Sequence, residues 1–127
     1  MKRAVVVENF QLIADIWVSL LKQLDFTEIL VLNGETETFN EILDWEPEIV
    51  LMDVNLGKDL NGFDITERLT RLKPELKVCV ISMHSGEMYT SLARKVGAKG
   101  YVCKNRSLSE VRQCIEKIIA GETCYIG

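Results

Sequence analysis

Short apolar runs alternate along the chain with longer segments in which apolar residues recur every three or four positions. Four of the five runs are continuous, which is typical of strands buried on both faces of a parallel sheet. The runs cover residues 4–7, 29–32, 49–52, 78–81 and 101–103. The other segments predict amphipathic helices, which are marked by Ile13, Trp17, Leu20 and Leu24, by Phe39, Ile42 and Leu43, by Ile65, Leu69 and Leu72, by Leu92 and Val96, and by Val111, Ile115 and Ile118.

Boundary signals agree with this alternation. Gly97 and Gly121 follow helical segments, where a C-terminal cap favours a residue with positive φ. Ser107 and Glu110 have the spacing of a capping box that opens the last helix. A strand–helix order repeated five times with short loops predicts a single α/β domain over residues 1–127. We expect a doubly wound (βα)5, flavodoxin-like three-layer sandwich, with a parallel five-stranded sheet in the order 2-1-3-4-5.

The charge pattern narrows the function classes. The net charge is −4, and the 15 Lys and Arg residues are scattered among 19 Asp and Glu residues. Nucleic-acid surfaces need a basic patch, so direct DNA or RNA binding is disfavoured. The N-terminal apolar run is too short for a signal-peptide core or a membrane span. We therefore predict a soluble, cytoplasmic protein without a membrane partner.

The four cysteines are Cys79, Cys103, Cys114 and Cys124. They form no C-x-x-C pair, so a zinc site or a thioredoxin-like motif has little support. Cys79 and Cys103 lie within apolar runs, where a free thiol packs as a small hydrophobic group. Packing is the favoured interpretation, and a disulfide or redox role is the alternative.

Polar side chains follow four of the predicted strands. Glu8 and Asn9 follow the first, Asp53 the third, Ser82 the fourth and Lys104 the fifth. Ligands of an open α/β sheet bind beyond the carboxyl ends of the strands, so these side chains should converge. An Asp can accept a phosphoryl group as a nucleophile, and a lysine and a hydroxyl can then contact the phosphoryl oxygens. Mg²⁺ (or Mn²⁺) suits a site with few protein oxygen ligands.

At this point the whole chain resembles the receiver domains of bacterial response regulators. The motifs that carry the resemblance are VVVEN, PEIVLMDVNL, NGFD, VISM and GAKGYVCK, in this order and spacing. The resemblance implies that Asp53 is the phosphoacceptor, Ser82 the switch hydroxyl and Lys104 the contact to the phosphoryl group. It also implies that Glu8, Asn9, Asp53 and the backbone oxygen of Asn55 hold the metal, that Tyr101 turns inward on activation, and that the side chains of Asn55 and His84 tune the phosphoryl lifetime.

The function implied by the resemblance is a phosphorylation-dependent signalling switch. A sensor histidine kinase, or a small phosphodonor, would phosphorylate Asp53. The face formed by the fourth helix, fifth strand and fifth helix would then change and control an output, which we expect to be transcription. Binding of a second copy on phosphorylation is expected too, but turnover of a substrate, as in an enzyme, is not.

Three departures from the family pattern matter. Asn9 stands where the family usually carries a second acid, which predicts weaker metal binding and slower phosphorylation. The loop VNLGKDLNG lacks the common Pro at Gly57 and has one residue more before Gly62. Lys104 is followed by Asn105 and not by Pro, as in regulators of the NarL/LuxR type. The tail AGETCYIG resembles the start of their linker, so DNA contact would come through an appended domain outside this chain.

Several alternatives stay open. Asn9 supports a pseudo-receiver, which would be a phosphorylation-impaired protein–protein interaction module. A flavodoxin-like cofactor protein would need a glycine-rich phosphate loop after the first strand, where Glu8-Asn9 stands instead. A phosphatase with an Asp nucleophile usually needs a second acid two residues later, where this chain has Asn55. Asn9 is also a candidate cap for the first helix. Tyr101 could instead be a half-buried aromatic at the edge of the sheet, and His84 an ordinary exposed loop residue.

Overall fold

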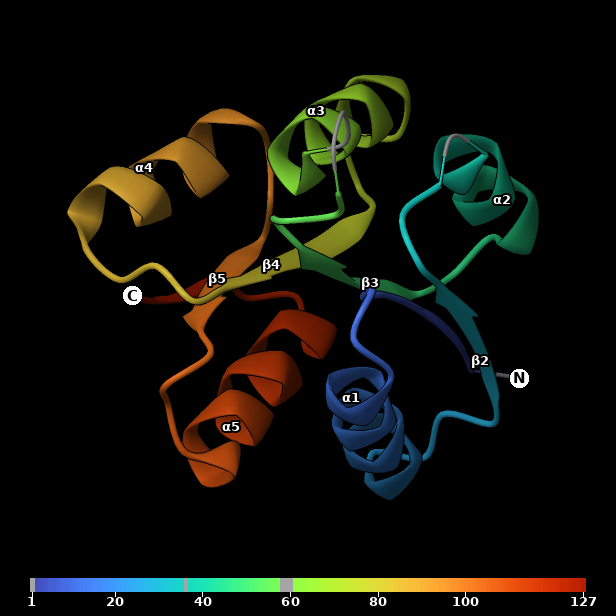
Figure 1. Ribbon diagram of the computed structural model, residues 1–127, viewed down its shortest axis with the longest axis horizontal. Helices are drawn as coiled ribbons and strands as arrows, with labels where there is room; N and C mark the ends of the chain where they lie inside the picture. Colours follow the sequence, from blue (N-terminus) through green and yellow to red (C-terminus); the bar gives the residue numbers. More distant parts are fainter. Residues whose placement is uncertain (1, 36, 58–60) are drawn as a thin grey trace.

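The computed structural model describes residues 2–35, 37–57 and 61–127. In chain order the elements are β1 (Arg3–Val7), α1 (Gln11–Gln23), β2 (Glu28–Leu32), α2 (Thr38–Trp45), β3 (Ile49–Asp53), α3 (Gly62–Leu72), β4 (Lys77–Ser82), α4 (Glu87–Lys95), β5 (Gly100–Cys103), α5 (Leu108–Ile119) and β6 (Cys124–Ile126). The strands form a parallel sheet in the order β2-β1-β3-β4-β5-β6. Helices α2, α3 and α4 cover one face, and α1 and α5 cover the other (Figure 1).

The predicted order 2-1-3-4-5 is confirmed, but the predicted strand number is wrong, because β6 extends the described sheet to six strands. Gly121, at φ +97°, ends α5 and turns the chain back toward the sheet. The backbone N–H of Cys124 then donates to the carbonyl of Lys99 at 3.0 Å. The segment expected to begin a linker is therefore an edge strand beside β5.

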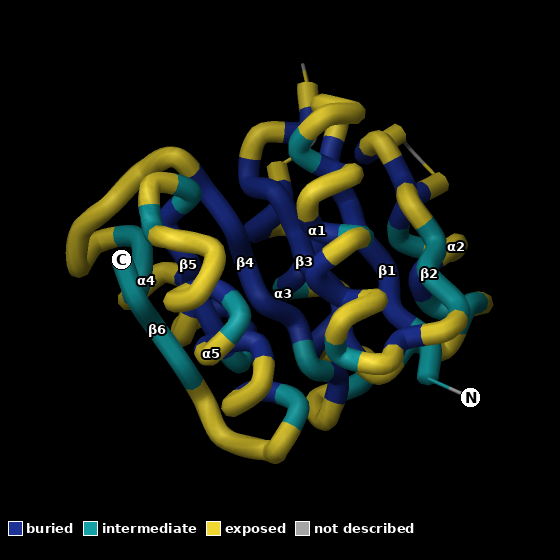
Figure 2. Tube along the Cα trace, turned by 90° about the horizontal axis from the view of Figure 1, so that it is seen from below, coloured by how far each residue is buried: buried dark blue, intermediate teal, exposed yellow. Residues whose placement is uncertain are grey.

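The continuous apolar runs are explained by two separate cores. Val5 and Val7 of β1 pack in the core under α2, α3 and α4, whereas Ala4 and Val6 pack in the core against α1 and α5. All five residues of β3 are buried. Figure 2 shows the buried strands enclosed by helices whose outer surfaces are exposed. Because β1, β3, β4 and β5 lie between two layers of helices, the side chains in the middle of these strands are apolar on both faces.

Most of the boundary predictions hold. Ser107 and Glu110 form the predicted capping box at the start of α5, and Gly97 and Gly121 both have positive φ. Asn9, however, does not cap α1. That helix begins after Phe10, whose backbone N–H donates to the Glu8 carboxylate at 3.2 Å. The start of α1 therefore has no side-chain cap.

The cysteines divide into two pairs. Cys79 and Cys103 are buried thiols, as predicted. Cys114 and Cys124 form a disulfide, so for them the alternative interpretation is the right one. Part of the VNLGKDLNG loop, residues 58–60, lies outside the described residues. In the described ranges, no helix combines the length and the apolar character that crossing a membrane requires.

Candidate functional site

Two carboxylates lie side by side at the carboxyl ends of neighbouring strands. Asp53 is the last residue of β3, and Glu8 comes directly after β1, which pairs with β3. The backbone N–H of Glu8 donates to the carbonyl of Leu32 at 2.9 Å, so the parallel ladder continues one residue beyond the strand and fixes Glu8. Only 1% of the Glu8 side chain and 6% of the Asp53 side chain are exposed.

Lys104 brings a positive charge to this pair from across the sheet. Its backbone N–H donates to the carbonyl of Ser82 at 2.7 Å, which anchors the residue after β5 to the end of β4. Its Nζ lies 3.0 Å from Glu8 Oε1 and 3.2 Å from Asp53 Oδ1. The sequence prediction that these three side chains converge is confirmed. One ammonium shared by two carboxylates leaves the cluster with one excess negative charge when all three are ionised.

The electrostatics of the cluster act most strongly on Asp53. Burial, followed by repulsion from Glu8, raises the pKa of Asp53 to about 6 from its ordinary value of 3.8, and the Lys104 ammonium opposes this rise. The dominant cause is loss of solvation of the charged form. The ionised form of such a carboxylate is stabilised by any ligand that brings positive charge to it.

Ser82 and Tyr101 extend the site toward α4. Ser82 ends β4, is buried, and accepts a hydrogen bond at its Oγ from the His84 backbone N–H at 3.2 Å. The hydroxyl of Tyr101 donates to the His84 carbonyl, and the ring is fully buried. Burial also raises the pKa of Tyr101. Tyr101 thus already occupies an inward position, and its movement on activation stays a prediction.

The remaining predicted residues lie on the surface. Asn9, Asn55 and His84 are exposed. The His84 ring stacks on Tyr89, with the ring centroids 4.7 Å apart. Among the described contacts, no hydrogen bond or ion pair joins the side chain of Asn9 or Asn55 to the carboxylates. Asn55 pairs instead with Asn61 through an isolated β-bridge.

Gly62 is a supporting residue whose role the sequence did not reveal. A Cβ at this position would collide with the carbonyl oxygen of Asp53 and would lie 3.0 Å from Met52 Cγ. The backbone N–H of Gly62 donates to the Val54 carbonyl at 2.9 Å. Asn61 caps α3 through its side-chain oxygen, which accepts from the Phe63 N–H at 2.8 Å. The Asn-Gly pair of the NGFD motif is the available signal, because only glycine lets α3 start this close to Asp53.

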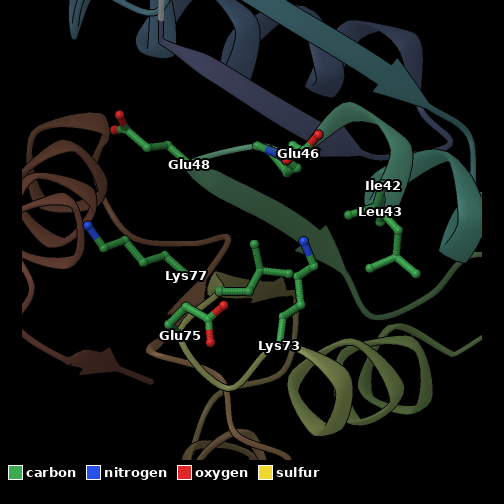
Figure 3. Close-up of a pocket in the computed structure, with 9 residues that line it drawn as sticks. Ile42, Leu43, Glu46, Glu48, Lys73, Glu75 and Lys77 are labelled. Carbon is green, nitrogen blue, oxygen red and sulfur yellow. The ribbon is translucent and has the colours of Figure 1, made fainter.

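A pocket at the opposite end of the sheet is separate from this cluster. It is bordered by the residues that precede β3 and β4 (Figure 3). Its charged lining combines Glu46, Glu48 and Glu75 with Lys73 and Lys77, so opposite charges offset one another. None of the side chains that the sequence predicted for the site lines this pocket.

Replacing Asp53 with Asn is expected to raise the free energy of unfolding of the metal-free chain near pH 7 by on the order of 1–3 kcal/mol. The pKa of Asp53 is raised in the folded state to about 6 from 3.8. Between these values the folded chain binds more protons than the unfolded chain, so the wild type loses stability as the pH rises through this window. Urea unfolding in the presence of a chelator measures the difference as a function of pH.

The gain should disappear below about pH 4, where the carboxyl is protonated in both states. Asp44→Asn, at an exposed position on α2, is the matched control and should change stability little. If Asp53→Asn raises the free energy of unfolding equally at every pH, or lowers it near pH 7, the ionised Asp53 carboxylate does not destabilise the folded state and the interpretation is wrong.

Comparison with known proteins supports this geometry. The response regulator receiver domain family matches residues 4–116. The transcriptional regulatory protein MctR of Rhizobium johnstonii is 32% identical over 124 residues, which are 97% of this chain but 58% of that protein. A LuxR-family response regulator from Aurantimonas sp. SI85-9A1 superposes with a TM-score of 0.88 at 24% identity, covering 96% of this chain and 87% of that one.

The isolated receiver domain of RcsB from Salmonella enterica serovar Typhimurium, solved with phosphomimetic BeF3−, superposes with a TM-score of 0.87 at 13% identity and covers 98% of this chain and 92% of that one. At these identities both superpositions establish the shared fold. The family match covers most of the chain, and the cluster of Glu8, Asp53 and Lys104 lies at the carboxyl ends of its strands. The chain belongs to the response regulator receiver domain family, and its relatives include the transcriptional regulatory proteins MctR and DegU.

Proposed function

We propose that this chain is a phosphorylation-dependent switch in which Asp53 accepts a phosphoryl group from a sensor histidine kinase in the cytoplasm. The observation that carries the proposal is the position of the Lys104 ammonium, 3.0 Å from Glu8 and 3.2 Å from Asp53 in a nearly buried cluster. A cation held against a strained carboxylate is prepared to contact the oxygens of an incoming phosphoryl group. Positioning and charge neutralisation of this kind provide most of the catalysis in phosphoryl transfer.

In the proposed transfer, the Asp53 carboxylate is the nucleophile. One carboxylate oxygen attacks phosphorus, the new P–O bond forms, and the P–N bond to the histidine of the kinase breaks as that histidine takes up a proton. Lys104 pairs with one phosphoryl oxygen, and the Ser82 hydroxyl donates a hydrogen bond to another. The chain carries the group and loses it again by hydrolysis, so it is a signalling protein and not a turnover enzyme.

Mg²⁺ (or Mn²⁺) is the proposed cofactor. Its donors would be the carboxylates of Glu8 and Asp53, the backbone oxygen of Asn55, and Asn9. The fit rests on two buried carboxylates that share a single ammonium, an oxygen-rich set that suits Mg²⁺ with retained waters. Among the described residues, no cluster of three or more His, Cys, Asp or Glu side chains could hold a metal, so amide and backbone oxygens would complete the site. When bound, the ion would supply positive charge to the phosphoryl oxygens.

The proposed output is transcription. The chain spans 58% of the length of MctR, which is named as a transcriptional regulatory protein. A DNA-binding domain would therefore lie outside this chain, and the chain itself would contact the kinase and, when phosphorylated, a second copy. The signal would pass through the face formed by α4, β5 and α5, which adjoins Ser82 and Tyr101.

Incubation with acetyl phosphate and Mg²⁺ is expected to add one phosphoryl group to the chain, measured by intact mass. Asp53→Asn should abolish the addition because it removes the nucleophile, and Asp44→Asn should be phosphorylated like the wild type. Beryllofluoride should shift the NMR signals of Ser82 and Lys104 in the wild type. An unmodified wild type that is also unchanged by beryllofluoride, or equal labelling of Asp53→Asn, would rule out the proposal.

A second candidate is a pseudo-receiver that acts only through protein contacts, which is favoured by the exposed and uncharged Asn9 beside Glu8. Asn9→Asp is expected to strengthen Mg²⁺ binding on the order of tenfold, because it brings a further charge to the ion. Gln23→Glu, which adds the same charge at the exposed C-terminal end of α1, away from the carboxyl ends of the strands, should change binding little. A wild type without measurable Mg²⁺ binding by NMR titration, together with no gain in Asn9→Asp, would favour the pseudo-receiver.

A further inference from the structure

The sixth strand joins three elements of the proposed signalling face. After α5, the chain turns at Gly121 and runs parallel to β5 along the edge of the sheet (Figures 1 and 2). Gly100 pairs with Cys124, Tyr101 with Tyr125, and Val102 with Ile126. Successive side chains of β6 therefore point to opposite sheet faces, one toward α5 and the next toward α4. The strand contacts both helices at once.

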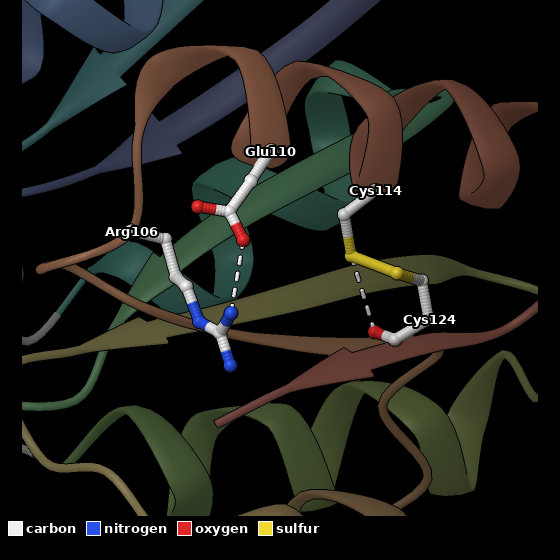
Figure 4. The surroundings of a disulfide bond; sticks show 4 residues. All are labelled: Arg106, Glu110, Cys114 and Cys124. Carbon is white, nitrogen blue, oxygen red and sulfur yellow. Dashed lines mark hydrogen bonds and ion pairs between the residues drawn. A yellow bond between two sulfur atoms is a disulfide. The ribbon is translucent and has the colours of Figure 1, made fainter.

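The disulfide fastens β6 to α5. Cys114, in the middle of α5, is bonded to Cys124 at the start of β6, and the two Cα atoms are 5.5 Å apart (Figure 4). This separation is ordinary for a disulfide. Gly100 makes the close approach possible, since a Cβ there would lie 2.7 Å from the carbonyl oxygen of Cys124. The link closes a short loop, since the two cysteines are ten positions apart in the sequence.

Polar and aromatic contacts fasten β6 on the side of α4. The hydroxyl of Tyr125 donates to the Ala98 carbonyl at 2.6 Å, and the Arg94 guanidinium lies 4.0 Å from the centre of the Tyr125 ring. Arg106 donates to the Gly127 carbonyl at 2.9 Å. In-register neighbours of parallel strands share a face, so Tyr125 lies beside the buried Tyr101. The strand thus helps to enclose the aromatic ring whose hydroxyl bonds the loop after Ser82.

We propose that Cys114 and Cys124 are a reversible thiol–disulfide pair: oxidation tethers β6 covalently to α5 and so holds it against β5, and reduction removes this tether. Disulfides in cytosolic proteins are usually transient, catalytic or redox-sensing, so this pair has a regulatory role if the chain works in the cytoplasm as proposed. In the reduced form, the Cys114 thiol can still donate to the Cys124 carbonyl, 3.3 Å from the sulfur. The reduced strand therefore docks as well, but without a covalent tether.

The oxidation balances with hydrogen peroxide as the oxidant. The sulfur of Cys124, a residue of intermediate burial, attacks one peroxide oxygen, an S–O bond forms, the O–O bond breaks, and one water leaves. The buried Cys114 sulfur then displaces the hydroxyl of this sulfenic acid as a second water, and the S–S bond forms. Two electrons pass from the thiols to one peroxide. A dithiol reductant reverses the step by thiol–disulfide exchange.

The coupling of this pair to phosphorylation rests on the proposed function. A clamped β6 keeps Tyr125 against Tyr101 and so favours the inward position of Tyr101, which is the position expected to accompany phosphorylation. By linkage, if oxidation and phosphorylation both favour the inward position of Tyr101, each of them favours the other. Oxidation should therefore raise the steady-state fraction of chain phosphorylated at Asp53 by acetyl phosphate.

Amide hydrogen exchange of the Cys124–Ile126 segment, measured without metal or phosphodonor, tests the clamp independently of the proposed function. Reduction of the peroxide-treated wild type with dithiothreitol should speed exchange on the order of 100-fold, as the loss of a tether across ten residues predicts. Cys114→Ala should exchange rapidly in both conditions. Cys79→Ala, which removes a buried thiol on β4, should keep the redox response.

Equal exchange in the oxidised and reduced wild type would overturn the proposal, as would two alkylatable thiols at Cys114 and Cys124 after peroxide treatment. A redox-dependent exchange rate in a chain that acetyl phosphate fails to label would uphold the clamp and reject the proposed function. A several-fold higher labelled fraction in the oxidised wild type than in Cys114→Ala would support the coupling, and equal fractions would reject it.

Discussion

The structure of the site depends on one interaction, the sharing of the Lys104 ammonium between the carboxylates of Glu8 and Asp53. Two charges of the same sign about 4 Å apart repel by roughly 4 kcal/mol at an effective dielectric near 20, and burial adds to the cost. A single lysine, the residue directly after β5, reaches across the end of β4 to offset this repulsion, and its backbone N–H donates to the Ser82 carbonyl. The four strands must therefore keep their order and register for the carboxylates to be tolerated.

This arrangement links stability to function. A cluster with an excess negative charge is poorly satisfied until a further cation arrives, and this is the property that the proposed metal binding and phosphorylation of Asp53 would use. Gly62 contributes by letting α3 begin against the backbone of Asp53. The loop that carries Asn55 is held by the bridge to Asn61. Gly62 and the Asn55–Asn61 bridge thus hold the backbone on either side of the loop after Asp53. The excess negative charge of the cluster can still be neutralised by a further cation.

The sequence predicted the parts of the fold that depend on burial on both faces of a sheet. Continuous apolar runs identified five strands, and the polar residues after them identified the cluster. The short β6 was missed because Cys-Tyr-Ile after a polar turn has no distinctive period, and its pairing depends on the tertiary contact of Cys124 with α5 and on the space beside Gly100. The sequence pattern also did not predict which way the side chains after β1 point: Asn9 is exposed to solvent, whereas its neighbour Glu8 is buried.

The proposed signalling face includes a sixth strand, which lies beside β5 at the edge of the sheet. Instead of a free edge at β5, the sheet ends in a strand that contacts α4 through Tyr125 and α5 through Cys124. Tyr101 is enclosed by this strand and bonded to the loop after Ser82. These contacts place the buried Tyr101 ring between β6 and the loop after Ser82.

The most direct test of the shared ammonium is an NMR titration of the Asp53 carboxyl carbon in the metal-free wild type and in Lys104→Met. The account predicts a pKa of about 6 for the wild type, above the ordinary 3.8. It predicts a still higher pKa for Lys104→Met, by about one unit or more, because the ammonium is the group that opposes the rise. An ordinary pKa in the wild type, or the same pKa in both proteins, would contradict the account.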